Sequence, residues 1–275
     1  MVFEEYGKNI AIMRYDDPNN WVKVFEDSVK NFPDRPYIGQ KDEAGNYYWI
    51  TYKEMANRVD NLRAGLAKID VVQGDSVGII AGNGIEWALG AFATFGLIAQ
   101  WVPMYEKELM ATWKYIISDA KVKILFVSTN EIHEKIKHFT NEISTLEKIY
   151  VIDSDAENSM KSLEKLGESN PIPSKEPELS DIASIIYTSG TTGDPKGVLL
   201  SHGNITNNAL AGKNLIPTLN ETSSALSILP WAHSYAQTAE LCAFTMLGAA
   251  IAITDAEHMG EDLVKTNPTF LICVP

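Results

Sequence analysis

The stretch from Tyr187 to His202 reads Y-T-S-G-T-T-G-D-P-K-G-V-L-L-S-H, and it restricts the fold more than any other segment. The β-prone run 184–187 predicts a buried strand that leads into it. Glycines in the stretch let the backbone adopt positive φ, so that successive N–H groups can turn inward. Together with four hydroxyls and one ammonium, these N–H groups predict a polyphosphate-binding loop. Its candidate ligand-binding residues are Thr188, Ser189, Gly190, Thr191, Thr192, Gly193 and Lys196.

The loop differs from the P-loop of nucleotide hydrolases, in which G-x-x-x-x-G-K-[ST] runs directly into a helix. Here Gly197 and the strand-like run 198–200 follow Lys196, and we expect a helix only from about Asn204. The loop should therefore connect two strands. The alternative is a hairpin rich in Gly, Thr and Ser that binds no ligand. The length of the consistent pattern favours the phosphate loop over that alternative.

The same stretch resembles the signature of the adenylate-forming (AMP-binding) superfamily, which comprises acyl-CoA synthetases, luciferases and the adenylation domains of peptide synthetases. The resemblance implies that the loop closes over the β- and γ-phosphates of ATP while a carboxylate attacks the α-phosphate. It implies ATP, Mg²⁺ and CoA as the cofactors and co-substrates. Lys196 is then a catalytic residue that stabilises the departing pyrophosphate, and the Thr188 hydroxyl is the candidate magnesium ligand.

A second motif, L-P-W-A-H-S-Y over residues 229–235, follows a predicted strand and precedes a predicted helix. Ligands of open α/β sheets bind at the carboxyl ends of strands, so a histidine here can contact a carboxylate. Taken alone, such a histidine more often caps a helix or contacts solvent. The superfamily has a Leu-Pro-x-x-His segment at this distance from its loop. The resemblance therefore implies that His233 is catalytic beside the acyl carboxylate, with Trp231 and Tyr235 as its substrate-binding neighbours.

Three further segments resemble the long-chain fatty acyl-CoA synthetases: N-G-I-E-W from Asn83, V-P-M-Y-E from Val102, and A-H-S-Y-A-Q-T-A-E from Ala232. The activity implied is ATP-dependent conversion of a fatty acid to acyl-AMP, followed by transfer of the acyl group to CoA. Activation of an aryl or amino acid is an alternative within the enzymes. A non-catalytic module that binds nucleotide or a partner protein is the alternative from another class.

Strands alternate with helices from Val77 to Ile152, which indicates βαβ units in largely parallel sheets covered by helices. The expected fold class is α/β: the layered large N-terminal domain of the adenylate-forming fold, truncated. We expect two sub-structures, about 1–152 and 181–275, joined by a polar connection over 153–180. The resemblance implies further segments and a C-terminal domain beyond Pro275. Residues 1–275 are therefore expected to be an incomplete N-terminal AMP-binding domain that is inactive alone.

The formal net charge of −13 argues against nucleic acid as a partner, because polyanion binding needs basic patches. Cys242 and Cys273 lie in apolar runs and are expected to be buried thiols of a reducing compartment. The N-terminus lacks the basic and apolar regions of a signal peptide. A cytoplasmic location is therefore the expectation.

Two uncharged stretches, 87–105 and 241–254, are interrupted by Gly or Pro, and acidic residues flank both. Each predicts a buried helix followed by a buried strand rather than a transmembrane segment. A peripheral membrane contact stays open. The run 270–274 predicts a core strand, and an exposed strand edge recruits other chains. We therefore expect self-association through surface contributed by roughly the last fifty residues.

Overall fold

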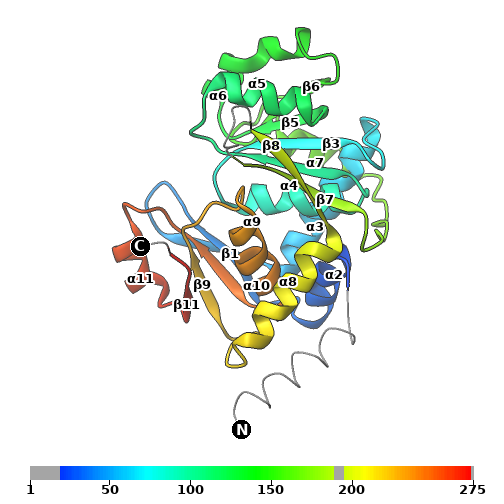
Figure 1. Ribbon diagram of the computed structural model, residues 1–275. Helices are drawn as coiled ribbons and strands as arrows, with labels where there is room; N and C mark the ends of the chain where they lie inside the picture. Colours follow the sequence, from blue (N-terminus) through cyan, green and yellow to red (C-terminus); the bar gives the residue numbers. More distant parts are fainter. Residues whose placement is uncertain (1–18, 189–194, 274–275) are drawn as a thin grey trace.

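The computed structural model describes residues 19–188 and 195–273, and their strands form two sheets packed around shared helices (Figure 1). The first sheet has the order β11-β9-β10-β1-β2, and the second has the order β6-β5-β3-β4-β7-β8. All neighbouring strands are parallel except the hairpins β1–β2 and β7–β8. The expected α/β class with mostly parallel sheets flanked by helices is confirmed.

The elements have the following bounds. The strands are β1 (Pro36–Lys41), β2 (Tyr47–Thr51), β3 (Ser76–Ile80), β4 (Gln100–Met104), β5 (Val122–Val127), β6 (Lys148–Val151), β7 (Ile182–Thr188), β8 (Lys196–Ser201), β9 (Ser224–Ser227), β10 (Ala250–Ile253) and β11 (Phe270–Leu271). The helices are α2 (Trp21–Asn31), α3 (Tyr52–Lys68), α4 (Ile85–Phe95), α5 (Met110–Asp119), α6 (Asn130–Ile136), the 3₁₀ helix η1 (Lys137–Asn141), α7 (Met160–Glu168), α8 (His202–Leu215), α9 (Ser234–Ala236), the π-helix η2 (Gln237–Cys242), α10 (Ala243–Leu247) and α11 (Met259–Thr266).

Two hydrophobic clusters account for the layers. One fills the space between the sheets, where the almost wholly buried α4 packs against β3 and β4 on one side and β1 on the other. The other lies on the far face of the six-stranded sheet, which α5 and α6 cover (Figure 1). Its side chains include Trp113, Ile117 and Ile132. Both faces of the parallel strands are buried, which explains the continuous apolar runs in their sequences.

Strands from the two expected sub-structures pair with each other in both sheets. β1 pairs with β10 in the register Ile38↔Ile251, and β4 pairs with β7 in the register Trp101↔Ser184. Each sheet therefore takes strands from both sides of the connection 153–180. Within that connection, helix α7 packs closely on α3 and buries Met160 and Leu163.

Two further expectations near the end of the chain are wrong. Of the core strand expected over 270–274, the described residues 270–273 contain only the two residues of β11, which are half-buried at the edge of the five-stranded sheet. Cys273 is exposed, whereas Cys242 is fully buried and its thiol pKa is raised by that burial. Edge position explains both differences, since β11 has β9 as its pairing partner among the described strands.

The two uncharged stretches fold as expected, into α4 followed by β4 and into α10 followed by β10. Among residues 19–188 and 195–273, no helix combines the length and the apolar character that crossing a membrane would require.

Strand β8 forms one edge of the six-stranded sheet and exposes Val198 and Leu199. We predict that the chain self-associates through this edge, which lies before the region expected from the sequence. Leu199→Lys should weaken the association more than Val264→Lys, a control on the exposed face of α11. Sedimentation velocity over a concentration series measures this. A monomer at every concentration, or an equal effect of both variants, would contradict the prediction.

Candidate active site

The candidate phosphate loop connects the two strands of a hairpin, as the sequence predicted. β7 is buried over Ala183–Ile186, and its last residue, Thr188, is exposed opposite Lys196 of β8. Directly opposed residues of antiparallel strands share one face, with Cβ atoms about 5 Å apart. The Thr188 hydroxyl and the Lys196 side chain thus flank the base of the loop. Five candidates of the loop lie outside the described residues: Ser189, Gly190, Thr191, Thr192 and Gly193.

A cavity of about 530 Å³ lies next to this hairpin, at the carboxyl ends of β4 and β7. Thr188 and Pro195 line one side of it, and His233 and Ser234 line another. Lys196 is not among the described residues that line it. The structure therefore brings together Thr188 and His233, which are far apart in the sequence and were singled out on different motifs. The remaining lining residues are Pro103, Met104, Tyr105, Glu108, Thr112, Ile116, Ile186 and Tyr187.

His233 has a defined backbone and a defined ring tautomer. Its N–H donates to the Pro230 carbonyl at 3.0 Å, which closes a turn, and its Nδ1 accepts from the Tyr235 N–H at 3.2 Å. Because Nδ1 is an acceptor, the proton of the neutral ring is assigned to Nε2. The imidazole is exposed at the cavity, so Nε2–H can donate to an anionic group bound there.

Trp231 lies in the His233 loop, the segment 228–233 between β9 and α9, and its side chain is fully buried. Its indole packs edge-on against Trp87, with the ring centroids 5.5 Å apart, and its main-chain N–H donates to Asn83 Oδ1 at 2.7 Å. Its neighbours Pro230 and Ala232 line a second cavity of about 820 Å³. The structure thus places Trp231 as an anchor of the loop, and direct contact with substrate stays a prediction.

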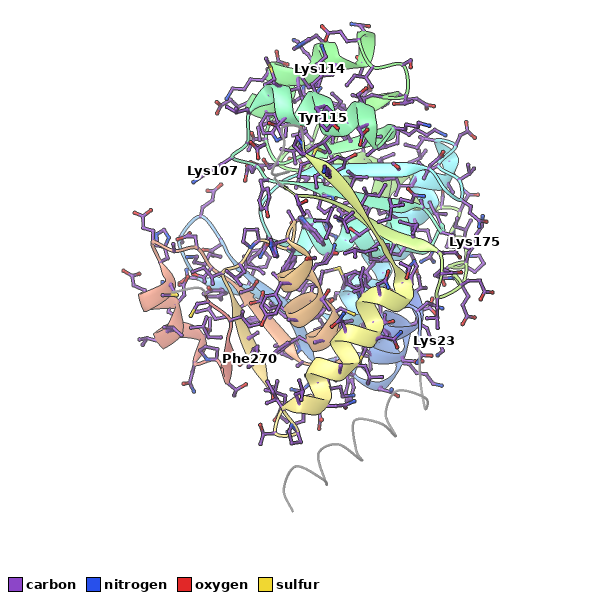
Figure 2. All side chains as sticks on the ribbon, viewed as in Figure 1. Lys23, Lys107, Lys114, Tyr115, Lys175 and Phe270 are labelled. Atoms are coloured by element: carbon purple, nitrogen blue, oxygen red, sulfur yellow. The ribbon has the colours of Figure 1, made fainter. Side chains whose placement is uncertain are left out.

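Tyr235 lies at the other end of the loop and borders a third, largely apolar cavity of about 570 Å³. Helix α8, η2, α10 and β11 enclose this space. Phe270, labelled in Figure 2, contributes from β11, and its ring centroid lies 5.4 Å from that of Phe244. Ser234 borders both this cavity and the one beside the hairpin. The apolar lining also includes Ile205, Ala209, Ala243, Leu247 and Ile272.

Sequence reasoning placed Tyr235 beside an apolar substrate site but missed the residues of α8 and α10 that line this third cavity. The run 241–254 predicted only a buried helix and strand, and α8 has weak amphipathic character. The sequence signal for this cavity is the apolar pair Ile205 and Ala209, four residues apart on α8. Helix α8 packs against α10.

Tyr187 fastens the end of β7 to α5. Its hydroxyl donates to Asp119 Oδ2 at 2.5 Å. Burial first, and the Asp119 carboxylate second, raise the pKa of Tyr187 far above its ordinary value. The hydroxyl therefore stays protonated and keeps this bond at physiological pH, which fixes the residue directly before Thr188.

A model of the AMP-binding enzyme family matches residues 25–275. The chain belongs to the AMP-binding enzyme family. It is 31% identical to long chain acyl-CoA synthetase 3 of Arabidopsis thaliana over 92% of its own length. The solved structure of an anthranilate CoA ligase in complex with anthranoyl-AMP superposes with a TM-score of 0.83 at 21% identity, over 92% of this chain and 49% of that one. A long-chain-fatty-acid-CoA ligase from Archaeoglobus fulgidus gives 0.80 at 20% identity, over 93% and 51%.

This AMP-binding chain spans about 41% of the length of the Arabidopsis relative. The two solved structures support the fold alone, because their sequence identity to this chain is low.

The described residues suit the magnesium–nucleotide complex that the family binds. They contain no cluster of three acidic, His or Cys side chains that would hold a metal ion by protein ligands alone. Magnesium bound with a nucleotide keeps several waters and takes most other ligands from phosphate. One hydroxyl, such as that of Thr188, and one nearby ammonium, such as that of Lys196, fit this mode of binding.

Proposed function

We propose that the natural protein carrying this chain is an ATP-dependent long-chain fatty acid–CoA ligase. One observation carries the proposal. The cavity beside the β7–β8 hairpin, which His233 lines, and the largely apolar 570 Å³ cavity share Ser234 in their walls. The name of the Arabidopsis relative and the match to the AMP-binding family support the choice of reaction.

In this proposal the β7–β8 hairpin binds the polyphosphate of ATP. Phosphoryl and nucleotidyl transfer depend chiefly on positioning and on stabilising negative charge. Lys196 supplies a positive charge on the face of the hairpin that Thr188 shares. Thr188, the hydroxyls of Ser189, Thr191 and Thr192, and the N–H groups of Gly190 and Gly193 complete the site. Magnesium, held partly by Thr188, neutralises phosphate charge when bound.

The fatty acid binds to the other two parts of the site, His233 and the apolar cavity. Its carboxylate accepts a hydrogen bond from Nε2 of His233, and its chain extends past Ser234 and Tyr235 into the 570 Å³ cavity. That volume lies within the range typical of small-molecule pockets. Apolar walls favour a hydrocarbon chain over an amino acid, and a long chain over a smaller aryl acid because it buries more apolar area. CoA then accepts the acyl group.

The proposal is tested by measuring thioester formation and AMP release with palmitate, benzoate and an amino acid at matched concentrations. We expect palmitate to be preferred by at least about tenfold, because each buried methylene contributes roughly 0.8 kcal/mol. Preference for benzoate or the amino acid would identify a different acid substrate. Nucleotide binding without turnover of any acid would indicate a non-catalytic module.

His233→Ala should impair use of the fatty acid more than use of ATP. A hydrogen bond to a charged group contributes about 1.5–3 kcal/mol, so we expect the KM for palmitate to rise about ten- to a hundredfold. The KM for ATP should change by less than about threefold. The control is His138→Ala, an exposed histidine on η1. A selective rise in the KM for ATP would show that His233 does not contact the acyl carboxylate.

A further inference from the structure

Glu240 of the π-helix η2 is a fully buried carboxyl directly behind the His233 loop. Its Oε2 accepts from the Ser227 hydroxyl at 2.5 Å and from Nε1 of Trp231 at 3.4 Å. Its Oε1 is buried and has no hydrogen-bond partner among the described residues. Buried polar groups are normally satisfied, so this arrangement calls for an explanation.

The same cluster holds the backbone of the loop through Asn83, which follows β3. The Asn83 amide nitrogen donates to the Leu229 carbonyl at 2.8 Å and to the Ser227 hydroxyl at 3.2 Å. Its Oδ1 accepts from the Trp231 N–H at 2.7 Å. Glu240 and Asn83 thus share Ser227 and Trp231 as partners, and together they hold the backbone that ends in the His233 turn.

The protonation state of Glu240 changes near neutral pH. Burial raises its pKa to about 7, and the hydrogen bonds from Ser227 and Trp231 oppose that rise only in part. No lysine or arginine among the described residues forms an ion pair with it. The neutral acid is therefore favoured below about pH 7, and the carboxylate above it.

Other ionisable groups around η2 do not offset this charge. Helices α8, α9 and α10 pack against η2, and β9 provides Ser227. The ionisable side chains of these elements are His202 and Lys213 on α8 and Tyr235 on α9; none is hydrogen-bonded to Glu240. His202 is neutral at pH 7, because burial lowers its pKa to about 4. Cys242 on η2 itself stays a neutral thiol.

We propose that Glu240 is a positioning residue whose neutral carboxyl fixes Ser227 and Trp231 and thereby presents His233 to the acyl carboxylate. Ionisation of Glu240 disfavours this arrangement, because a buried carboxylate without a cation and with one unpaired oxygen is poorly solvated. The loop then opens toward water and the fatty acid binds less tightly. This inference rests on the proposed function.

The test compares Glu240→Gln and Glu240→Ala with the natural protein at pH 6 and pH 8.5. Gln keeps an oxygen that accepts from Ser227 and Trp231 and cannot ionise, so its KM for palmitate should stay low at both values. The wild-type KM should rise about tenfold between them. Ala lacks the acceptor, so its KM should be raised about tenfold at both values. The KM for ATP should not follow this pattern, and exposed Glu168→Gln is the control.

A second readout does not depend on activity. Since the Trp231 indole lies beside the carboxyl, tryptophan fluorescence should show a transition near pH 7 that is absent from Glu240→Gln. Ser227→Ala keeps the carboxyl and should move the midpoint to higher pH, because a bond that lowers the pKa is lost. If Glu240→Ala fails to fold, Ser227→Ala tests the inference in its place. A transition that persists in Glu240→Gln would overturn the inference, as would a wild-type KM that does not change with pH. Fluorescence behaving as expected without turnover of palmitate would instead contradict the proposed function.

Discussion

Replacing Lys196 with Met is expected to lower the rate of acyl-adenylate formation about a hundred- to a thousandfold. Removal of one donor that stabilises developing charge costs about 2.7–4 kcal/mol in well-studied sites. Lys196 is exposed at the start of β8, opposite Thr188, so Met should preserve the hairpin while removing the charge. Both kcat and kcat/KM should fall by the same factor, because the charge develops in the transition state.

Stability measurements separate this effect from unfolding. An exposed lysine contributes little packing, so the thermal midpoint of Lys196→Met should stay within about 2 °C of the wild type. Lys175→Met is the matched control, since Lys175 is also exposed and lies in the connection that leads into β7, at the opposite end of that strand from Thr188 (Figure 2). Near-normal turnover of Lys196→Met would show that the hairpin is not the phosphate site.

Gly167→Ala in α7 is expected to destabilise the fold strongly. A Cβ at this position would lie 1.9 Å from the Asn61 carbonyl oxygen and 2.6 Å from the Gly65 nitrogen, both backbone atoms of α3. Rigid backbone cannot move aside as a side chain can, so α7 must shift away from α3. Overpacking costs about 1–3 kcal/mol, and we expect the upper end of that range because the contact is with backbone atoms.

Chemical denaturation measures the loss of unfolding free energy in Gly167→Ala. Gly260→Ala in α11 is the matched control, because a Cβ there meets nothing within 4 Å. Alanine is a better helix former than glycine, so the control should be neutral or more stable by up to about 1 kcal/mol. Equal stabilities of the two variants would contradict the close contact between α3 and α7.

Local features of this fold could be predicted from the sequence. The phosphate hairpin follows from a β-prone run, a Gly- and hydroxyl-rich loop and a second β-prone run, and the structure has β7 and β8 there. The capping box of Thr51 and Glu54 likewise starts α3, with the threonine side chain and the glutamate side chain each bonded to the other's backbone. Such signals need only neighbouring residues.

Long-range pairing and burial could not be predicted in this way. Nothing near β1 indicates that it pairs with β10, more than two hundred residues away in the chain. Trp231 was expected to border substrate, which stays a prediction, and its packing on Trp87 and its hydrogen bond to Asn83 could not be inferred from its neighbours in the sequence. The sequence did not indicate that α7 is part of the core, because it has few apolar residues and these are buried only through its close packing on α3.

Palmitate-dependent exchange of labelled pyrophosphate into ATP tests most directly our proposal that this AMP-binding chain is part of a fatty acid–CoA ligase. The assay reports reversible formation of acyl-AMP before CoA is needed. We expect exchange in the natural protein that carries this chain, dependent on both palmitate and magnesium, and lost in Lys196→Met. Exchange that proceeds equally without palmitate, or that survives in Lys196→Met, would contradict it.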